Sequence, residues 1–398
     1  MISNRRDIRP ALGLRRIINV SGTMTALGAS IVVPEAVDTI EGVLSEFVEI
    51  NDLHRKASRA IADATGAEAG CVTASASAGI TIAVAGAMTG VEIARIEQLP
   101  DTTGMKDEVL IQTGHMVYYG APIEQAIRLA GAKVVAVGQA THARPHQLAG
   151  SIGDRTAAAV YVVSHHAVQY GQIALSEFCT ICRERNVPVI VDAASEYDLK
   201  GFLRDGADIV VYSAHKFLGG PTAGIVAGRK PLVRAAFLQN YGIGRGMKVG
   251  KEGIAGTIAA LEAWGKRDHA EVRARETGYL KLWLETFSGL PGVAVEIIPD
   301  PTNNPLDRLK LRIIPEKAGT TAAALAGALA KGDPPVIVRD HEVEHGYFYL
   351  DPCNLHPGEA QIVADRITTT LEELRGEPVP DLDELRRRQY EALLAWPD

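Results

Sequence analysis

The chain has 398 residues, of which 46% are hydrophobic and 22% are charged. This composition is ordinary for a globular enzyme, and the length is sufficient for one large domain with a sizeable core and a second, smaller domain. The formal net charge of −7 argues against nucleic acid as a partner, because a phosphate backbone binds to a basic face. No apolar run approaches membrane-spanning length, so we expect no membrane partner and a cytoplasmic location.

The four cysteines are too few to form a disulfide framework in a chain of this size. Cys179 and Cys182 have the C-x-x-C spacing of redox and zinc motifs. However, their segment (176–186) has the pattern of a helix that buries both sulfurs, and no second pair of metal ligands follows. We therefore predict two structural cysteines and no metal site.

In chain order, the sequence predicts five segments. They are an N-terminal arm and entrance segment (1–40), a large α/β domain (41–255), a linking helix (256–288), a small C-terminal α+β domain (289–377) and a charged helical tail (378–398). The arm carries five arginines, a charge run that is usually a solvated surface. Within the tail, Leu382–Leu394 has an amphipathic helical pattern.

Short β-branched apolar runs alternate with helical patterns through the large domain. This alternation is typical of a mostly parallel sheet with right-handed crossovers and helices on both faces. We assign strands near residues 109–115, 133–137, 158–163, 187–191, 209–212 and 224–227, and a short strand that begins near residue 69. Beyond residue 288, the runs 293–298, 309–314, 335–338 and 347–350 alternate in the manner of antiparallel strands, with helices at 320–331 and 359–374.

Two strands of the large domain end in reactive side chains. Asp192 ends the run 187–191, and Lys216 follows the run 209–212 within a Ser-Ala-His-Lys motif. Both positions are at the carboxyl ends of strands, where α/β sheets bind ligands. Pyridoxal phosphate (PLP) needs a lysine for its Schiff base and an acid that keeps its pyridine nitrogen protonated. The alternative is a salt-bridged aspartate and a surface lysine, but the pair in this setting favours a PLP site.

The motifs around these two residues resemble a known family. Asp192-Ala-Ala-Ser-Glu and Ser213-Ala-His-Lys-Phe-Leu-Gly-Gly-Pro are similar to motifs of fold-type I PLP enzymes of the selenocysteine synthase-like branch. Within that branch, the chain is most similar to D-glucosaminate-6-phosphate ammonia-lyases. The resemblance extends over about 17–352, and the lysine motif is much less specific for substrate than for the superfamily. It implies the aspartate aminotransferase-like fold, a PLP cofactor and a homodimer or higher oligomer with an active site shared between subunits.

The resemblance also implies further cofactor contacts. Ser75, Ala76 and Ser77 lie in a turn of small residues between a short strand and an amphipathic helix predicted over 80–88, and the exposed N–H groups at such a helix start bind phosphate. His115 ends the next predicted strand, where enzymes of this fold place the side chain that stacks on the PLP ring. His166 is a predicted contact of the ring hydroxyl, although a histidine pair is more often a structural feature. The other predicted contacts are Ala194, Ser213 and His215.

An arginine in the small domain is the predicted carboxylate site. Arg339 follows the run 335–338, and arginine binds a carboxylate through two parallel hydrogen bonds. Fold-type I enzymes bind the substrate carboxylate with an arginine from this domain. The alternative is a surface ion pair with Asp340 or Glu342.

Two further segments are candidate substrate contacts. Arg245, Lys248 and Lys251 lie within seven residues on a Gly-rich segment, a spacing that allows a flexible backbone to gather three cations around a phosphate. A solvated loop or a subunit contact is the alternative. Ser21 and Thr23 follow the first short strand, which lies along the active-site entrance in the family that the chain resembles; the alternative is ordinary turn chemistry.

These observations favour a PLP-dependent ammonia-lyase. Such an enzyme dehydrates a 2-amino-3-hydroxy acid to an enamine, which hydrolyses to a 2-keto acid and ammonia, and the substrate would be an anionic amino acid such as D-glucosaminate 6-phosphate. An amino-acid racemase or aminotransferase on the same fold is the alternative, because the surrounding pocket chooses the outcome. A non-catalytic PLP-binding protein is a further alternative.

Overall fold

The computed structural model describes residues 7–377 and 382–397, and the chain divides into two compact units. One unit is Ser30–Arg267, and the other combines Met1–Ala29 with Asp268–Asp398. These boundaries differ from the predicted ones at 40, 255 and 288. The N-terminal segment belongs to the C-terminal unit because its strand β1 pairs with β11. The predicted linking helix is two helices, because Asp268 caps a new one with hydrogen bonds from the N–H groups of Ala270 and Glu271.

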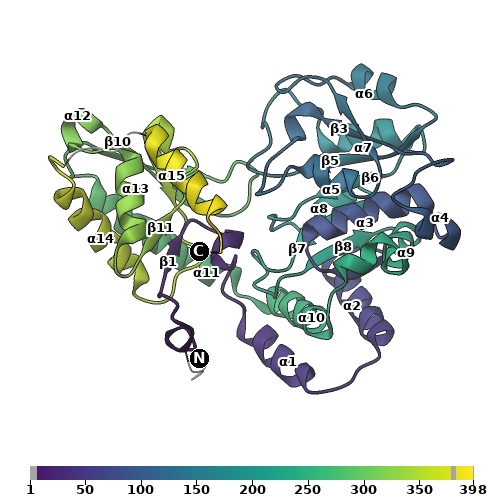
Figure 1. Cartoon of the computed structure of the whole chain (residues 1–398), viewed down its shortest axis with the longest axis horizontal. Coiled ribbons are helices and arrows are strands. Elements are labelled where there is room, and N and C mark those ends of the chain that lie inside the picture. Colours follow the sequence, from purple (N-terminus) through teal and green to yellow (C-terminus); the bar gives the residue numbers. More distant parts are fainter. Residues whose placement is uncertain (1–6, 378–381, 398) are drawn as a thin grey trace. The chain divides into compact units, whose positions relative to one another are not determined.

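The larger unit is built on a seven-stranded sheet with the order β2-β8-β7-β6-β5-β3-β4 (Figure 1). Strands β3 to β7 are parallel, and β8 is antiparallel to both of its neighbours, so the prediction of a mostly parallel sheet is confirmed. The strands are β2 (Ala69–Thr73), β3 (Glu108–Gln112), β4 (Lys133–Val137), β5 (Thr156–Val162), β6 (Val189–Asp192), β7 (Ile209–Ser213) and β8 (Gly224–Gly228).

Helices cover both faces of this sheet, because its strands carry apolar side chains on both faces. Val189 and Val191 of β6 pack on one face and Ile190 on the other, because side chains alternate along a strand. The helices of the larger unit are α1 (Pro34–Leu44), α2 (Ile50–Thr65), α3 (Ala76–Thr89), α4 (Ile93–Gln98), α5 (Ile123–Arg128), α6 (Pro145–Ser151), α7 (Leu175–Arg183), α8 (Gly201–Arg204), α9 (Lys230–Leu238) and α10 (Lys251–Lys266).

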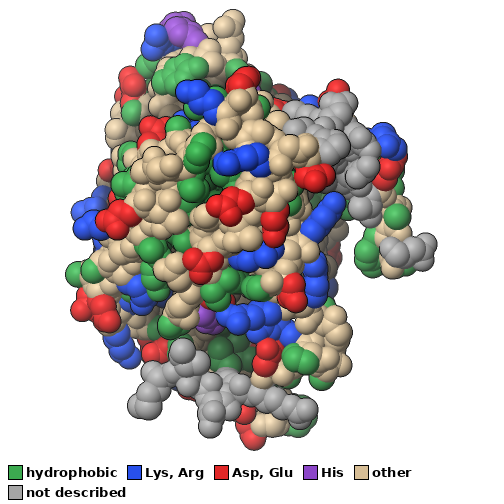
Figure 2. Space-filling view, turned by 90° about the vertical axis from the view of Figure 1, so that its left-hand side faces the viewer, with side chains coloured by type: hydrophobic (Ala, Val, Ile, Leu, Met, Phe, Trp, Pro, Cys, Tyr) green, Lys and Arg blue, Asp and Glu red, His purple; other side chains and the backbone are tan. Residues whose placement is uncertain are grey.

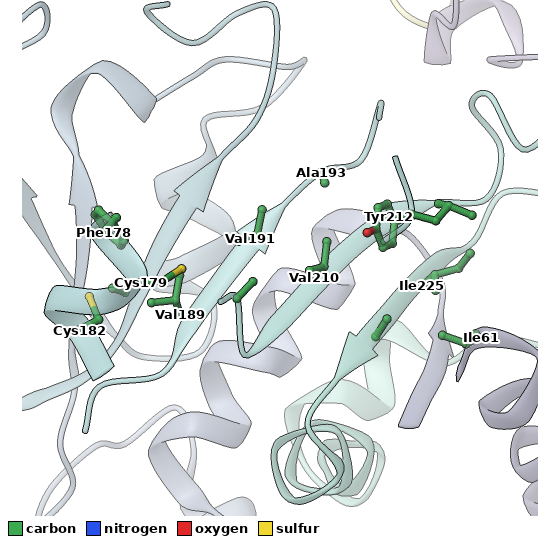
Figure 3. Packing of buried hydrophobic residues seen from close by; sticks show 14 of the residues in the cluster. Ile61, Phe178, Cys179, Cys182, Val189, Val191, Ala193, Val210, Tyr212 and Ile225 are labelled. Atoms are coloured by element: carbon green, nitrogen blue, oxygen red, sulfur yellow. The ribbon is translucent and has the colours of Figure 1, made fainter. Parts of the chain in front are cut away.

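One face of the sheet packs against α2, α7 and α10, and the other packs against α3, α5 and α9. Figure 3 shows part of the first core, in which Cys179 and Cys182 of α7 lie close to Val189. Both thiols are buried and free, and burial raises the pKa of each to about 12. The prediction that α7 buries both sulfurs is confirmed.

The smaller unit contains a three-stranded antiparallel sheet with the order β12-β10-β9. Its core includes Trp283, Phe348 and Ile367. The predicted antiparallel pairing of the run 335–338 is wrong, because β11 pairs in parallel with β1 and meets β12 only at a bridge between Arg339 and Tyr349. The elements are β1 (Ile18–Val20), α11 (His269–Phe287), β9 (Val293–Pro299), β10 (Asp307–Ile313), α12 (Pro315–Ala318), α13 (Ala322–Lys331), β11 (Val336–Val338), β12 (Tyr347–Leu350), α14 (Glu359–Glu373) and α15 (Leu382–Leu394).

The surface carries charges of both signs. Figure 2 shows one face of the molecule, on which basic and acidic side chains are interspersed and neither sign forms a continuous field. In the described part of the chain, no helix combines the length and the apolar character that crossing a bilayer requires.

Candidate active site

The predicted cofactor residues meet at one edge of the seven-stranded sheet. Ser213, the last residue of β7, pairs with Gly224 of β8, and Gly224 pairs in turn with Thr73, the last residue of β2. The loop into α3 therefore starts at the same edge as the loop that carries Lys216. The N–H of Ser213 donates to the carbonyl oxygen of Ala194 at 3.3 Å, which connects the loop after β6 to the end of β7.

Asp192 and Lys216 lie within electrostatic reach of each other at this edge. The Asp192 carboxylate accepts a hydrogen bond from the Ala194 N–H at 3.1 Å, and the Lys216 Nζ donates to Ser195 Oγ at 2.5 Å. Burial raises the pKa of Asp192, and the Lys216 charge opposes this shift. Burial lowers the pKa of Lys216, against the charges of Asp192 and Glu196. The edge therefore holds an enclosed amine next to two carboxylates.

The start of α3 has the geometry of a phosphate site. Ser75 caps the helix, because its Oγ accepts from the Ala78 N–H at 3.1 Å. The first N–H groups of a helix have no intrahelical acceptor, so those of Ala76 and Ser77 are available to an anion. Gly224 allows this turn to lie against β8, since a Cβ there would lie 2.2 Å from the carbonyl oxygen of Ser75.

Tyr119 joins this site, although no sequence pattern marks it as a site residue. Its hydroxyl donates to Ser77 Oγ at 3.1 Å across 42 residues of chain. Burial raises the pKa of Tyr119, the bond to Ser77 opposes this, and the Asp192 charge raises the pKa further. Tyr119 therefore contacts the α3 turn and lies within electrostatic reach of Asp192. Ser195 and Glu196 were also missed as site residues, although both stand in the motif that follows Asp192.

His115 is held tightly within the fold. It is 3% exposed, its Nδ1 accepts from the Val162 N–H at 3.2 Å, and its ring lies edge-on to Tyr161 at 4.4 Å between centroids. Burial lowers the pKa of His115 to about 4, so the ring is neutral at physiological pH. Its stacking on PLP stays a prediction.

The remaining histidines are more exposed. His166 is exposed, and its ring centroid lies 4.0 Å from that of its neighbour His165. His215 Nδ1 is buried and has no hydrogen-bond partner in the described structure, next to Lys216 in the chain. Burial lowers the pKa of His215, and the Lys216 charge adds to the shift. A buried ring nitrogen without a partner favours contact with a ligand.

Two predicted substrate residues lie together in the smaller unit. Val20 pairs with Val338 in the parallel β1–β11 ladder, so Ser21 and Arg339 follow neighbouring strands at the same end. Ser21 is 5% exposed and Arg339 is 8% exposed, whereas Thr23 is half-buried in the turn beyond. The alternative for Arg339 was a surface ion pair with Asp340 or Glu342. In the described structure Arg339 is buried and forms no ion pair with either residue.

The basic segment is more ordered than a flexible loop. Arg245 lies in a 3-10 helix (Ile243–Met247), and Lys251 is the first residue of α10. Arg245 and Lys248 are exposed, while Lys251 Nζ donates to the carbonyl oxygen of Glu46 at 2.5 Å. Two of the three cations are thus exposed to solvent, and the third donates to the segment between α1 and α2.

The donor set at the sheet edge fits PLP. The enclosed lysine suits the aldehyde of the cofactor, and the buried carboxylate within its electrostatic reach suits the pyridine nitrogen. The capped helix start suits the phosphate. The unpartnered Nδ1 of His215 is a further polar group that a ligand would satisfy.

Comparisons with known proteins identify relatives of this chain. A family model described as SelA, L-seryl-tRNA selenium transferase, matches residues 17–282. The chain is 37% identical to a D-glucosaminate-6-phosphate ammonia lyase of Salmonella typhimurium (strain 14028s / SGSC 2262), over 92% of this chain and 98% of the relative. It is 34% identical to a 5'-C-glycyluridine monooxygenase-decarboxylase of Streptomyces sp, over 92% of each chain.

Solved structures give the same result. A structure of D-glucosaminate-6-phosphate ammonia-lyase matches with a TM-score of 0.84 and 37% identity, covering 93% of this chain and 99% of that one. An aspartate aminotransferase from Thermus thermophilus shares the fold, with a TM-score of 0.54 and 16% identity over 90% of this chain and 99% of that one. The chain therefore belongs to the SelA family of PLP-dependent enzymes with the aminotransferase-like fold.

Proposed function

We propose that the protein is a PLP-dependent ammonia-lyase, which converts a 2-amino-3-hydroxy acid to a 2-keto acid and ammonia. The observation that carries the proposal is the enclosed Lys216 amine beside Asp192, in a chain that is 37% identical to an ammonia lyase over almost its whole length. The proposed substrate is a phosphorylated amino-sugar acid such as D-glucosaminate 6-phosphate, and we place the active site at the interface of a homodimer.

Each residue at the sheet edge has a proposed part in binding. Bound PLP would supply an electron sink for the bond that breaks at the substrate Cα. Asp192 would hold the proton of the pyridine nitrogen, and the α3 start at Ser75, Ala76 and Ser77 would hold the phosphate. The residues proposed to surround the ring are His115, His166, Ala194, Ser213 and His215.

Lys216 is the proposed base at Cα. Burial lowers the pKa of this amine, which favours the neutral form that accepts a proton. Ser195 Oγ accepts a hydrogen bond from the amine and so fixes its direction. The reaction removes a proton from Cα and the hydroxyl from Cβ as water, and that water is regained when the free enamine hydrolyses. The net products are therefore one keto acid and one ammonia.

Product analysis of the holoenzyme tests this function. With D-glucosaminate 6-phosphate and no amino acceptor, we expect equal amounts of ammonia and keto acid, measured by coupled enzymatic assays. A requirement for an amino acceptor would indicate an aminotransferase, and inversion at Cα without ammonia release would indicate a racemase. Consumption of dioxygen with release of carbon dioxide would place the chain with its monooxygenase-decarboxylase relative. Any of these three outcomes contradicts the lyase proposal.

Arg339→Lys tests the proposed carboxylate site. We expect KM to rise by about tenfold or more with a smaller change in kcat, because a point charge replaces a planar fork that forms two parallel hydrogen bonds. Steady-state kinetics measure both constants. Arg312→Lys, the same change at an exposed position of the same unit, is the control and should leave both unaltered. If Arg339→Lys behaves like this control, Arg339 does not bind substrate.

The double variant Arg245→Ala/Lys248→Ala tests phosphate recognition. Wild type should prefer a phosphorylated aminohexonate over the unphosphorylated one in kcat/KM. The variant should reduce this preference by about tenfold or more, because hydrogen bonds from two cations to phosphate are lost. Lys266→Ala, at the exposed far end of α10, is the control. Wild type without the preference, or a preference that survives the double change, would show that this segment does not bind the phosphate.

A further inference from the structure

Two buried atoms of opposite charge in the smaller unit have no hydrogen-bond partner. They are Nε of Arg339 and Oε2 of Glu342, three residues apart in the chain. A buried polar atom that forms no hydrogen bond costs free energy, and most such atoms in native proteins are paired with protein or with a ligand. Both atoms therefore need an explanation.

The fold fixes the backbone of Arg339, while no hydrogen bond or ion pair of the described structure engages its side chain. Arg339 and Tyr349 exchange two backbone hydrogen bonds of 3.0 Å, and the guanidinium carbon lies 5.8 Å from the centre of the Tyr349 ring. Burial lowers the pKa of Arg339, and the charge of Arg308 lowers it further, while Glu342 acts in the opposite direction. Arg339 and Glu342 thus interact through space, yet no hydrogen bond or ion pair of the described structure joins them.

Arg308, whose charge acts on Arg339, forms hydrogen-bonded ion pairs with two carboxylates. Arg308 donates from Nε to Asp351 at 2.8 Å and from Nη1 to Asp300 at 2.6 Å, and all three side chains are buried. Those two carboxylates are therefore already engaged. Glu342 is the other carboxylate whose charge acts on Arg339, and in the described structure it forms no ion pair with that guanidinium.

We propose that Glu342 accepts a hydrogen bond from a hydroxyl group of the same substrate whose carboxylate binds to Arg339. A polyhydroxylated acid supplies both missing partners: its carboxylate oxygen accepts from Arg339 Nε, and its hydroxyl donates to Glu342 Oε2. A plain carboxylic acid satisfies Arg339 alone and leaves Glu342 unpaired. The pair therefore selects hydroxylated acids. This inference rests on the proposed function for the identity of the carboxylate at Arg339.

Binding of two inert six-carbon acids to the PLP-loaded enzyme tests the inference. Gluconate carries hydroxyl groups and hexanoate does not, and neither has an amine, so neither turns over. By isothermal titration calorimetry, we expect wild type to bind gluconate more tightly than hexanoate. Glu342→Gln should weaken gluconate by about tenfold or more, since a bond to a charged acceptor is lost. Hexanoate should bind as in wild type or more tightly, because a negative charge near Arg339 is removed.

The control is Glu344→Gln, the same change at an exposed position two residues away, which should alter neither affinity. If wild type binds the two acids with equal affinity, the inference is overturned. It is also overturned if Glu342→Gln weakens the binding of both acids equally. The outcomes also separate this inference from the proposed function. If gluconate binding depends on Glu342 but the protein has no lyase turnover, only the proposed function is rejected. If the protein turns over substrate but gluconate binding does not depend on Glu342, only the inference is rejected.

Discussion

Lys216→Ala is expected to remove the visible absorbance of the bound cofactor and to lower kcat by at least about a thousandfold. The reason is that this side chain is both the proposed covalent anchor of PLP and the proposed base at Cα, and loss of a base alone costs a factor of about 100 to 10,000. The absorbance spectrum of the purified variant and its steady-state rate measure the two effects separately.

The fold of this variant should be intact, because Lys216 follows β7, its amine donates to Ser195, and it belongs to neither hydrophobic core of the sheet. Circular dichroism checks this point. Lys200→Ala, at an exposed lysine in the loop after β6, is the control and should retain both spectrum and rate. A wild-type spectrum in Lys216→Ala would remove this residue from its proposed role.

Asp192→Asn should retain PLP and lose most turnover, by about a hundredfold or more. An amide cannot hold the pyridine proton, and without that proton the ring is a poor electron sink. Cofactor content, measured by release of PLP in alkali, should be close to wild type because the α3 start and Lys216 are unchanged. The steady-state kcat then reports the loss.

A matched control for Asp192→Asn is available within the same unit. Asp198→Asn makes the same change at an exposed position of the loop after β6 and should leave kcat unaltered. Near wild-type kcat in Asp192→Asn would show that this carboxylate does not face the pyridine nitrogen. Loss of cofactor and activity together would instead assign Asp192 to the structure of the sheet edge, which also contradicts the proposed role.

The sheet of the larger unit could be predicted from the sequence because its signals are local. Each strand is a short apolar run between turns, and Asp192 and Lys216 follow two runs that turn out to be hydrogen-bonded neighbours. Parallel neighbours end at the same edge, so the position of each residue after its own strand was sufficient to bring the pair together.

The parts that escaped prediction depend on contacts between distant segments. The partner of β11 is β1, and nothing in a three-residue run such as Val336–Val338 specifies a strand at the other end of the chain. Tyr119 reaches Ser77 from an irregular loop, where no periodic pattern directs a side chain. The lack of a hydrogen bond between Arg339 and Glu342 could not be predicted either. It became apparent only in the structure, where Arg308 binds Asp300 and Asp351.

The proposed PLP site is tested most directly by identifying the lysine that carries the cofactor. Borohydride reduction of the holoenzyme fixes PLP to the amine that holds it, and peptide mass spectrometry then locates the added mass. We expect one modified peptide, with the cofactor on Lys216, and no incorporation in Lys216→Ala. A stable label on any other lysine, or no label in a holoenzyme that shows the visible absorbance, would contradict the proposed site.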